Sequence, residues 1–223
     1  MPKINTQINI LSTKKIDNNL LVSNLHWISE DFIQTAPVTF EFPKISNTDF
    51  IAFTSKNAVQ SVLNQYKKST FKNNKVVCVG NKTAALLQEK NIQVVHVANY
   101  AKELGEWLVK NNIKNTIHFC GNLKREELKD SLLHNHLNYR EIQVYKTTLT
   151  PKKITDNING IIFFSPSAVK SYTMLNQTDN KIAFCIGNTT ANEAKKYFSK
   201  IIIADENSIE NTIITTQKYF LNV

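Results

Sequence analysis

Two pieces of this chain are repeated later in the same order. Ile51-Ala-Phe-Thr-Ser-Lys-Asn-Ala-Val59 matches Ile161-Ile-Phe-Phe-Ser-Pro-Ser-Ala-Val169, and Val76-Val-Cys-Val-Gly-Asn-Lys-Thr-Ala84 matches Ala183-Phe-Cys-Ile-Gly-Asn-Thr-Thr-Ala191. The copies are separated by 110 positions, counted from Ser55, and by 107 positions, counted from Gly80. A repeat of this length is too long for a solenoid. It predicts two similar domains, each with hydroxyl-bearing loops after its strands.

Short apolar runs alternate with amphipathic segments along most of the chain. We expect strands at 8–11, 50–53, 76–79, 93–97, 116–120, 160–164, 181–186 and 200–204. We expect helices at 56–66, 83–90, 101–111, 124–133, 168–175, 190–198 and 208–221. Continuous apolar strands that alternate with helices are typical of parallel sheets covered on both faces. Ligands bind such sheets at the carboxyl ends of the strands.

Two stretches, 35–43 and 140–148, instead alternate polar and apolar residues with period two. This pattern is typical of half-exposed strands. If the two stretches pair, they form a two-stranded linker at 37–41 and 143–148. The chain would then build one discontinuous domain from 1–36 and 149–223 and a second domain from 42–142. The predicted fold class is α/β, with two similar flavodoxin-like parallel-sheet domains and a hinge that lets a cleft open and close.

The composition limits the classes of partner. The 223 residues suit two domains, and the formal net charge of +9 suits a polyanionic partner, although the lysines could equally be solvated surface residues. No basic run and no nucleic-acid motif is present, so we expect no nucleic-acid partner. The chain has neither a signal-peptide core nor a long apolar stretch. We therefore expect a cytoplasmic protein without a membrane partner.

The sequence offers little support for metal or cofactor chemistry. Cys78, Cys120 and Cys185 each lie in an apolar run and have no metal-site spacing, as expected for buried thiols in a reducing compartment. The five glycines are too dispersed for a dinucleotide fingerprint or a P-loop. His134 and His136, two positions apart, point to different helix faces. We expect neither a metal nor a cofactor.

Four expected strands end in a cluster of small polar residues where a helix should begin. The clusters are Thr54-Ser55, Asn81-Lys82-Thr83, Ser165-Pro166-Ser167 and Asn188-Thr189-Thr190. Such residues cap helices, which accounts for one residue in each loop. Backbone N–H groups at helix starts also bind anions. Capping alone, and capping combined with the binding of a ligand that carries several carboxylates, both remain open.

Six pieces of the chain, taken in order, are Phe53-Thr-Ser-Lys-Asn-Ala-Val59, Val79-Gly-Asn-Lys-Thr-Ala84, Cys120-Gly-Asn-Leu-Lys-Arg-Glu126, Val144-Tyr-Lys-Thr147, Phe164-Ser-Pro-Ser-Ala168 and Ile186-Gly-Asn-Thr-Thr-Ala191. Together they resemble the uroporphyrinogen-III synthase family, in which the matching pieces occur in the same order. The resemblance implies two α/β domains joined by a two-stranded linker and a cofactor-free enzyme. It also implies the substrate hydroxymethylbilane, a linear tetrapyrrole with many carboxylates. The family cyclises this substrate in the interdomain cleft to uroporphyrinogen III, with loss of water and inversion of ring D.

The resemblance also implies roles for individual residues. Tyr145 matches a functional tyrosine on the returning linker strand, where a phenol could donate a proton or hydrogen bond to the departing hydroxyl. The alternative is that Tyr145 is an ordinary strand aromatic beside the hinge. The implied substrate-binding residues are Thr54, Ser55, Asn81, Thr83, Asn122, Lys124, Ser165, Ser167, Thr189 and Thr190. The pair Lys56-Asn57 departs from the family pattern, which has a basic residue at the second position. Lys124 and Arg125 could instead be a solvated helix start.

Two further readings compete with an enzyme. One is a two-domain protein that closes on a polyanionic small molecule without catalysis. The other is an inactive homologue that acts through protein contacts. For the enzyme, we expect a monomer, with a transient contact to the preceding enzyme of the pathway as a further expectation.

Overall fold

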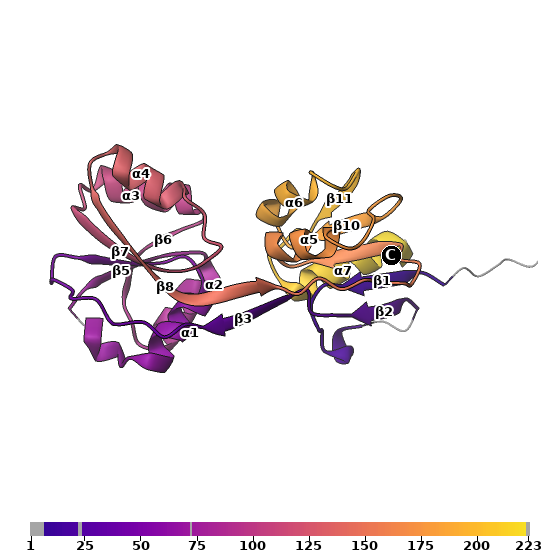
Figure 1. Ribbon diagram of the computed structural model, residues 1–223, viewed down its shortest axis with the longest axis horizontal. Helices are drawn as coiled ribbons and strands as arrows, with labels where there is room; N and C mark the ends of the chain where they lie inside the picture. The colour runs from indigo at the N-terminus through magenta and orange to yellow at the C-terminus, as the bar shows by residue number, and fades with distance from the viewer. Residues whose placement is uncertain (1–6, 22–23, 72, 222–223) are drawn as a thin grey trace, which may run out of the picture. The chain divides into compact units, whose positions relative to one another are not determined.

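The computed structural model describes residues 7–21, 24–71 and 73–221 (Figure 1). The chain divides into two compact units. Unit 1 comprises Met1–Gln34 and Thr148–Val223, and unit 2 comprises Thr35–Thr147. Each unit has its own sheet and its own helices, so each is described separately.

Unit 2 is built on a six-stranded sheet with the order β3-β8-β7-β4-β5-β6. Its strands are β3 (Ile33–Pro37), β4 (Phe50–Phe53), β5 (Lys75–Val79), β6 (Val94–Ala98), β7 (Asn115–Gly121) and β8 (Asn138–Leu149). Its helices are α1 (Lys56–Gln65), α2 (Asn81–Glu89), α3 (Ala101–Lys110), α4 (Glu127–His134) and the 3-10 turn η2 (Lys68–Phe71). The neighbours from β8 to β6 all run parallel.

The sheet of unit 2 is covered on both faces, which explains its continuous apolar strands. Helices α1 and α2 lie on one face and α3 and α4 on the other (Figure 1). Within β4, Ile51 and Phe53 belong to the core under α1 and α2. Phe50 and Ala52 belong to the core under α3 and α4. Successive side chains therefore face opposite cores, and every position of this strand is buried.

Unit 1 is built on a five-stranded parallel sheet with the order β11-β10-β9-β1-β2. Its strands are β1 (Asn9–Ser12), β2 (His26–Ser29), β9 (Gly160–Phe163), β10 (Ile182–Cys185) and β11 (Lys200–Ile203). Its helices are α5 (Pro166–Thr173), α6 (Asn188–Ala194), α7 (Ile209–Leu221) and the 3-10 turn η1 (Asn18–Leu20). One core contains residues of α5 and α6, and the other contains residues of α7.

The two sheets have the same layout with a different chain order. The sequence repeat equates β4 with β9 and β5 with β10. With these pairs aligned, β6-β5-β4-β7-β8 of unit 2 matches β11-β10-β9-β1-β2 of unit 1. The units are thus circular permutations of one sheet. Counted along its own chain, unit 1 has the flavodoxin order 2-1-3-4-5. The predicted fold class, two similar parallel-sheet α/β halves, is confirmed.

Strands β3 and β8 each run from one unit into the other (Figure 1). Val38 N donates to Val144 O at 2.9 Å and Thr150 N donates to Phe32 O at 2.9 Å, so the two strands run antiparallel. The expected strand at 35–43 ends early, at Pro37. The segment after it instead packs Phe40 and Phe42 against the core of unit 2. Strand β2 was not predicted from the sequence.

Candidate functional site

The expected site loops of unit 2 lie at the carboxyl edge of its sheet. Because β4, β5, β6 and β7 run parallel, the loops that follow Phe53, Val79, Ala98 and Gly121 leave from one edge. Gly80, which begins the loop after β5, has φ +84° and donates its N–H to Ala98 O at 2.8 Å. Glycine adopts this left-handed region without steric cost. Neighbouring loops are therefore fixed to each other through the backbone.

A β-bulge places Tyr145 at this edge. Along the β7–β8 pair, Cys120 lies opposite Gln143 but Gly121 lies opposite Tyr145, so Val144 is an extra residue. Consecutive side chains of a regular strand point to opposite faces. With the bulge, Val144 and Tyr145 both pack against the core under α1 and α2. Bulges commonly redirect a side chain beside an active site.

The ring of Tyr145 lies directly against the backbone of Gly121. A Cβ atom added to Gly121 would lie 2.4 Å from Cζ of Tyr145 and 2.8 Å from its hydroxyl oxygen. Real Cβ atoms essentially never approach other atoms so closely. Gly121 is therefore required for the observed position of the ring, since any other residue would displace it.

Ser55 fixes the hydroxyl end of the same tyrosine. Its Oγ donates to the hydroxyl of Tyr145 at 3.1 Å and accepts from the N–H of Ala58 at 3.2 Å as the N-cap of α1. Burial raises the pKa of Tyr145, the hydrogen bond from Ser55 opposes this rise, and nearby Cys120 adds to it. The phenol is therefore protonated near neutral pH. Because it accepts from Ser55, its own O–H is not used in that bond.

Thr54 is joined to a buried histidine that is not among the predicted site residues. Nε2 of His118 lies 2.9 Å from Oγ1 of Thr54, and Nδ1 lies 2.8 Å from the hydroxyl of Tyr139. His118 is 1% exposed. The pKa of His118 is lowered to about 3, chiefly by burial and to a smaller extent by Lys124, while Glu126 opposes the shift. Burial also raises the pKa of Tyr139. The chain Thr54–His118–Tyr139 is therefore uncharged near neutral pH.

A signal for His118 was present in the sequence. It is a polar residue between Ile117 and Phe119, inside the run Thr116-Ile-His-Phe-Cys120 of an expected strand. A polar side chain inside a buried strand needs hydrogen-bond partners. Its partners come from β8 and from the loop after β4, which are distant in sequence, so the pattern alone could not identify them.

Asn122 holds β8 in place next to Tyr145. Its Nδ2 donates to Thr147 O at 3.1 Å, and Thr147 N donates to its Oδ1 at 2.8 Å. The side chain thus continues the β7–β8 ladder past the bulge. The side chain of Asn122 is therefore bonded to the backbone of β8 two residues beyond Tyr145.

Lys124 is engaged by carboxylates of its own unit. Its Nζ lies 2.7 Å from Glu126 and 3.1 Å from Glu141, and its side chain is 13% exposed. Hydrogen bonds to both carboxylates raise its pKa despite the opposing effect of burial. Its charge is therefore balanced locally, and its role in substrate binding stays a prediction. Arg125 pairs with Glu127 at 3.5 Å.

The other predicted residues of unit 2 lie in first turns of helices. Asn81 is exposed and Thr83 is 4% exposed, both at the start of α2. Lys56 and Asn57 are both exposed at the start of α1. The structure thus presents Asn81 and Asn57 to solvent and packs Thr83 into its unit.

In unit 1 the predicted residues lie at the corresponding edge of its sheet. Ser165 caps α5 and accepts from the N–H of Ala168 at 3.2 Å, which repeats the cap made by Ser55. Ser167 is half-buried in the first turn of α5. Thr189 is half-buried and Thr190 is 2% exposed at the start of α6. The repeated sequence therefore builds the same local corner in each unit.

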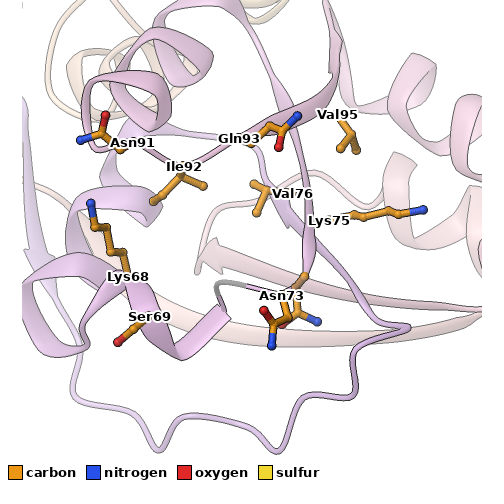
Figure 2. Close-up of a pocket in the computed structure, with 10 residues that line it drawn as sticks. Lys68, Ser69, Asn73, Lys75, Val76, Asn91, Ile92, Gln93 and Val95 are labelled. Carbon is orange, nitrogen blue, oxygen red and sulfur yellow. The ribbon is translucent and has the colours of Figure 1, made fainter.

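A pocket of about 890 Å³ lies at the opposite, amino edge of the unit 2 sheet (Figure 2). It is lined by residues at the starts of β5 and β6 and in the segments before them, among them Lys68, Lys75 and Gln93. Figure 2 shows Val76 and Ile92 between these polar side chains. The residues that line it include none of the predicted site residues. In unit 2 the predicted site residues therefore lie at the carboxyl edge of the sheet, and this pocket lies at its amino edge.

Two kinds of feature are absent from the described ranges, 7–21, 24–71 and 73–221. Within them, no group of three or more His, Cys, Asp or Glu residues could hold a metal ion. No helix in that part of the chain is both long and apolar enough to cross a membrane.

Comparison with known proteins identifies the family. The family model described as uroporphyrinogen-III synthase HemD matches residues 28–213. No curated protein matches the chain. Among solved structures, uroporphyrinogen-III synthetase from Helicobacter pylori is 20% identical, with a TM-score of 0.69 over 96% of this chain and 100% of that chain. A mutant uroporphyrinogen III synthase from the extremely thermophilic bacterium Thermus thermophilus is 12% identical, with a TM-score of 0.71 over 96% and 99%. These structures show the same fold, and the family model, which spans most of the sequence, shows that the chain belongs to the uroporphyrinogen-III synthase family, the cyclising hydro-lyases of tetrapyrrole synthesis.

Proposed function

We propose that this enzyme converts hydroxymethylbilane to uroporphyrinogen III and that Tyr145 is its catalytic proton donor. The observation that carries the proposal is the hydrogen bond from Ser55 to the Tyr145 hydroxyl. A phenol that accepts from Ser55 keeps its own O–H for another acceptor. Burial raises its pKa, so the proton is present at neutral pH.

The proton balance of the reaction suits a single phenol. As the C–O bond of the hydroxymethyl group breaks, the phenol proton passes to the departing oxygen, which leaves as water. The last pyrrole ring attacks the remaining carbon cation through its substituted α-carbon and forms a spiro-pyrrolenine. The bond from that α-carbon to the neighbouring methylene bridge then breaks, and the methylene carbon bonds to the free α-carbon of the ring, which inverts the ring and closes the macrocycle. The proton that this ring loses when it becomes aromatic again can return to the phenolate. The net reaction is loss of one water, and the tyrosine is regenerated.

Binding of the substrate carboxylates is assigned to the polar residues at the strand ends. In unit 2 these are Thr54, Asn81, Thr83, Asn122 and Lys124, and in unit 1 they are Ser165, Ser167, Thr189 and Thr190. The charge supports this role in part: unit 2 holds 16 of the 27 basic residues but only 9 of the 18 acidic ones. We assign Ser55 and Asn122 chiefly to the positioning of Tyr145, because both side chains are engaged by it or by its strand.

Much of the catalysis in this proposal is orientation. The bilane closes without help to the non-inverted isomer, so the enzyme must hold the chain in the arrangement that leads to inversion. Fixed geometry of reacting groups can contribute as much to a rate as acid–base chemistry. We further propose that the enzyme is a cytoplasmic monomer that acts without a cofactor.

The test is a product-isomer assay. Freshly generated hydroxymethylbilane is incubated with and without the protein, the products are oxidised to porphyrins, and the isomers are separated by chromatography. We expect predominantly type III product with the wild type. Type I product alone, formed at the rate of the blank, would contradict the proposed reaction and favour binding without catalysis.

A further inference from the structure

The hydroxyl of Thr54 lies at the candidate site, but its partner His118 determines whether this hydroxyl donates or accepts their hydrogen bond. Thr54 directly precedes Ser55, the partner of Tyr145. Its Oγ1 is 2.9 Å from Nε2 of His118, which is buried in β7. A neutral imidazole donates from one nitrogen and accepts at the other. The tautomer of His118 therefore decides whether the Thr54 proton is free or used.

The two tautomers have opposite consequences for an anionic substrate. If Nε2 carries the proton, it donates to Thr54, and the Thr54 O–H can donate to a carboxylate. If Nδ1 carries the proton, Thr54 must donate to Nε2. It then presents only lone pairs, which repel a carboxylate. The position of one proton on the buried ring of His118 thus determines whether the Thr54 hydroxyl attracts or repels a substrate carboxylate.

The partner of Nδ1 favours the first tautomer. The hydroxyl of Tyr139 lies 2.8 Å from Nδ1. A phenol is a stronger acid than a neutral imidazole N–H, so the phenol is the preferred donor of the pair. The phenol has a second, weaker partner in the carboxylate of Glu141. Lys124 engages this carboxylate at 3.1 Å, which makes it a poorer acceptor for the phenol proton. Burial lowers the pKa of His118 to about 3, so the ring is neutral and must choose one tautomer.

We propose that Tyr139 fixes His118 as the Nε2–H tautomer, and that His118 is a positioning residue that turns the Thr54 hydroxyl into a donor for a substrate carboxylate. The first part concerns the free protein. The second part, the role towards the substrate, rests on the proposed function.

The first experiment reads the tautomer directly and needs no substrate. Long-range proton–nitrogen NMR spectra of ¹⁵N-histidine-labelled protein distinguish the two neutral forms, and a His118→Gln spectrum assigns the resonances. We expect the Nε2–H form from about pH 5 to 8, with no titration. In Tyr139→Phe we expect this fixed tautomer to be lost. An Nδ1–H form in the wild type, or an unchanged ring in Tyr139→Phe, would overturn the proposal.

The second experiment tests whether His118 acts through Thr54. We expect Tyr139→Phe and Thr54→Val each to lower kcat/KM for type III product about tenfold, the usual effect of losing one hydrogen bond. The double variant should be no worse than the poorer single variant, because both changes remove the same donor. His118→Gln, which keeps an N–H within reach of Thr54, should retain more activity than His118→Leu. Losses that multiply in the double variant would overturn the coupling.

The controls separate this inference from the proposed function. Tyr197→Phe is the matched control for Tyr139→Phe, because Tyr197 is an exposed tyrosine of unit 1, and it should leave kcat/KM unchanged. If the wild type makes no type III product, the proposed function fails. The NMR spectra still decide the tautomer in that case, so the two failures are distinguishable.

Discussion

The hydroxyls of Ser55 and Tyr145 lie 3.1 Å apart, although 90 residues separate them in the chain. Ser55 caps α1 with the same oxygen, so the start of a helix sets the position of the phenol. We expect Tyr145→Phe to lower kcat for type III product by about a hundredfold or more, the scale of a lost general acid. Steady-state kinetics with isomer separation measure this. A variant with wild-type kcat would rule out the proton-donor role.

Ser55→Ala should have a smaller kinetic effect and a separate effect on stability. Loss of the hydrogen bond to Tyr145 should lower kcat about tenfold. Loss of the cap should lower the free energy of unfolding by about 1 kcal/mol. Ser165→Ala removes the equivalent cap in unit 1, so it is the matched control for stability, measured by denaturant unfolding. If Ser55→Ala lowered stability but left kcat unchanged, Ser55 would be only a cap.

Gly121→Ala should inactivate the enzyme by displacing the ring of Tyr145. The new methyl group would lie 2.4 Å from Cζ of the ring, so the ring must move. We expect a cost of about 1–3 kcal/mol in unfolding free energy, as for other overpacked sites, and a loss of kcat similar to that of Tyr145→Phe. In a Tyr145→Phe background the same change should cause little further loss of kcat. A large additional loss there would show that Gly121 acts on something other than the phenol.

Stability should decrease at alkaline pH because buried thiols and phenols resist ionisation. Burial raises the pKa of Cys78 and Cys120 to about 11 and that of Cys185 and Tyr172 to about 12. The unfolded chain releases these protons from the ordinary value of 9.0 for thiols upwards, while the folded chain keeps them. Their contribution is therefore complete below pH 9 and is lost as pH rises towards 12. Urea unfolding at about pH 7, 9 and 10 should show the decline, and Cys185→Ala should show a shallower one.

His118 should lower the free energy of unfolding at acid pH, whereas the buried thiols and phenols lower it at alkaline pH. Burial lowers its pKa from 6.5 to about 3, so below pH 6.5 the unfolded chain binds a proton that the folded chain does not. The stability from the neutral ring is present above pH 6.5 and is lost as pH falls towards 3. The stability difference between wild type and His118→Gln should therefore shrink from about pH 7 to about pH 4 in denaturant unfolding. A constant difference would mean that folding does not shift the pKa of His118.

The pocket in Figure 2 should have no role in the reaction. Lys68 and Gln93 line it at the amino edge of the sheet, away from the strand ends that carry Ser55 and Tyr145. We expect Lys68→Ala and Gln93→Ala to leave kcat and KM for type III product within about twofold of wild type. Surface substitutions away from the residues that bind or react with substrate usually have small effects. A marked rise in KM for either variant would place part of the substrate at this edge.

The strands and helices that carry the site loops could be predicted because their residues follow simple patterns. In β4 every residue is apolar and buried, and Ser55 follows as a cap, so both boundaries are evident from the sequence. Strand β2 was missed because His26-Trp-Ile-Ser29 lies at the edge of its sheet, is only partly buried and has polar ends. The sequence pattern of so short a run does not distinguish a strand from a loop.

The contacts that position Tyr145 could not be predicted from local pattern. The alternation in 140–148 indicates a strand but does not reveal that Val144 is an extra residue opposite Gly121. The partners of His118 likewise come from segments 64 and 21 residues away. The family resemblance supplied the tyrosine, and only the register of β7 with β8 shows why a glycine must face it.

The circular permutation of the two sheets has a consequence for the order of folding. All strands from β4 to β8 follow one another closely, so the sheet that carries Tyr145 can assemble as soon as that part of the chain leaves the ribosome. In the other sheet Ile10 pairs opposite Gly160, so β1 must wait for a segment made 150 residues later. Closing so long a loop is entropically costly and slows assembly. The half with the tyrosine is therefore expected to fold first, while the edge of β1 that faces β9 stays unpaired and depends on chaperones or fast completion of the chain.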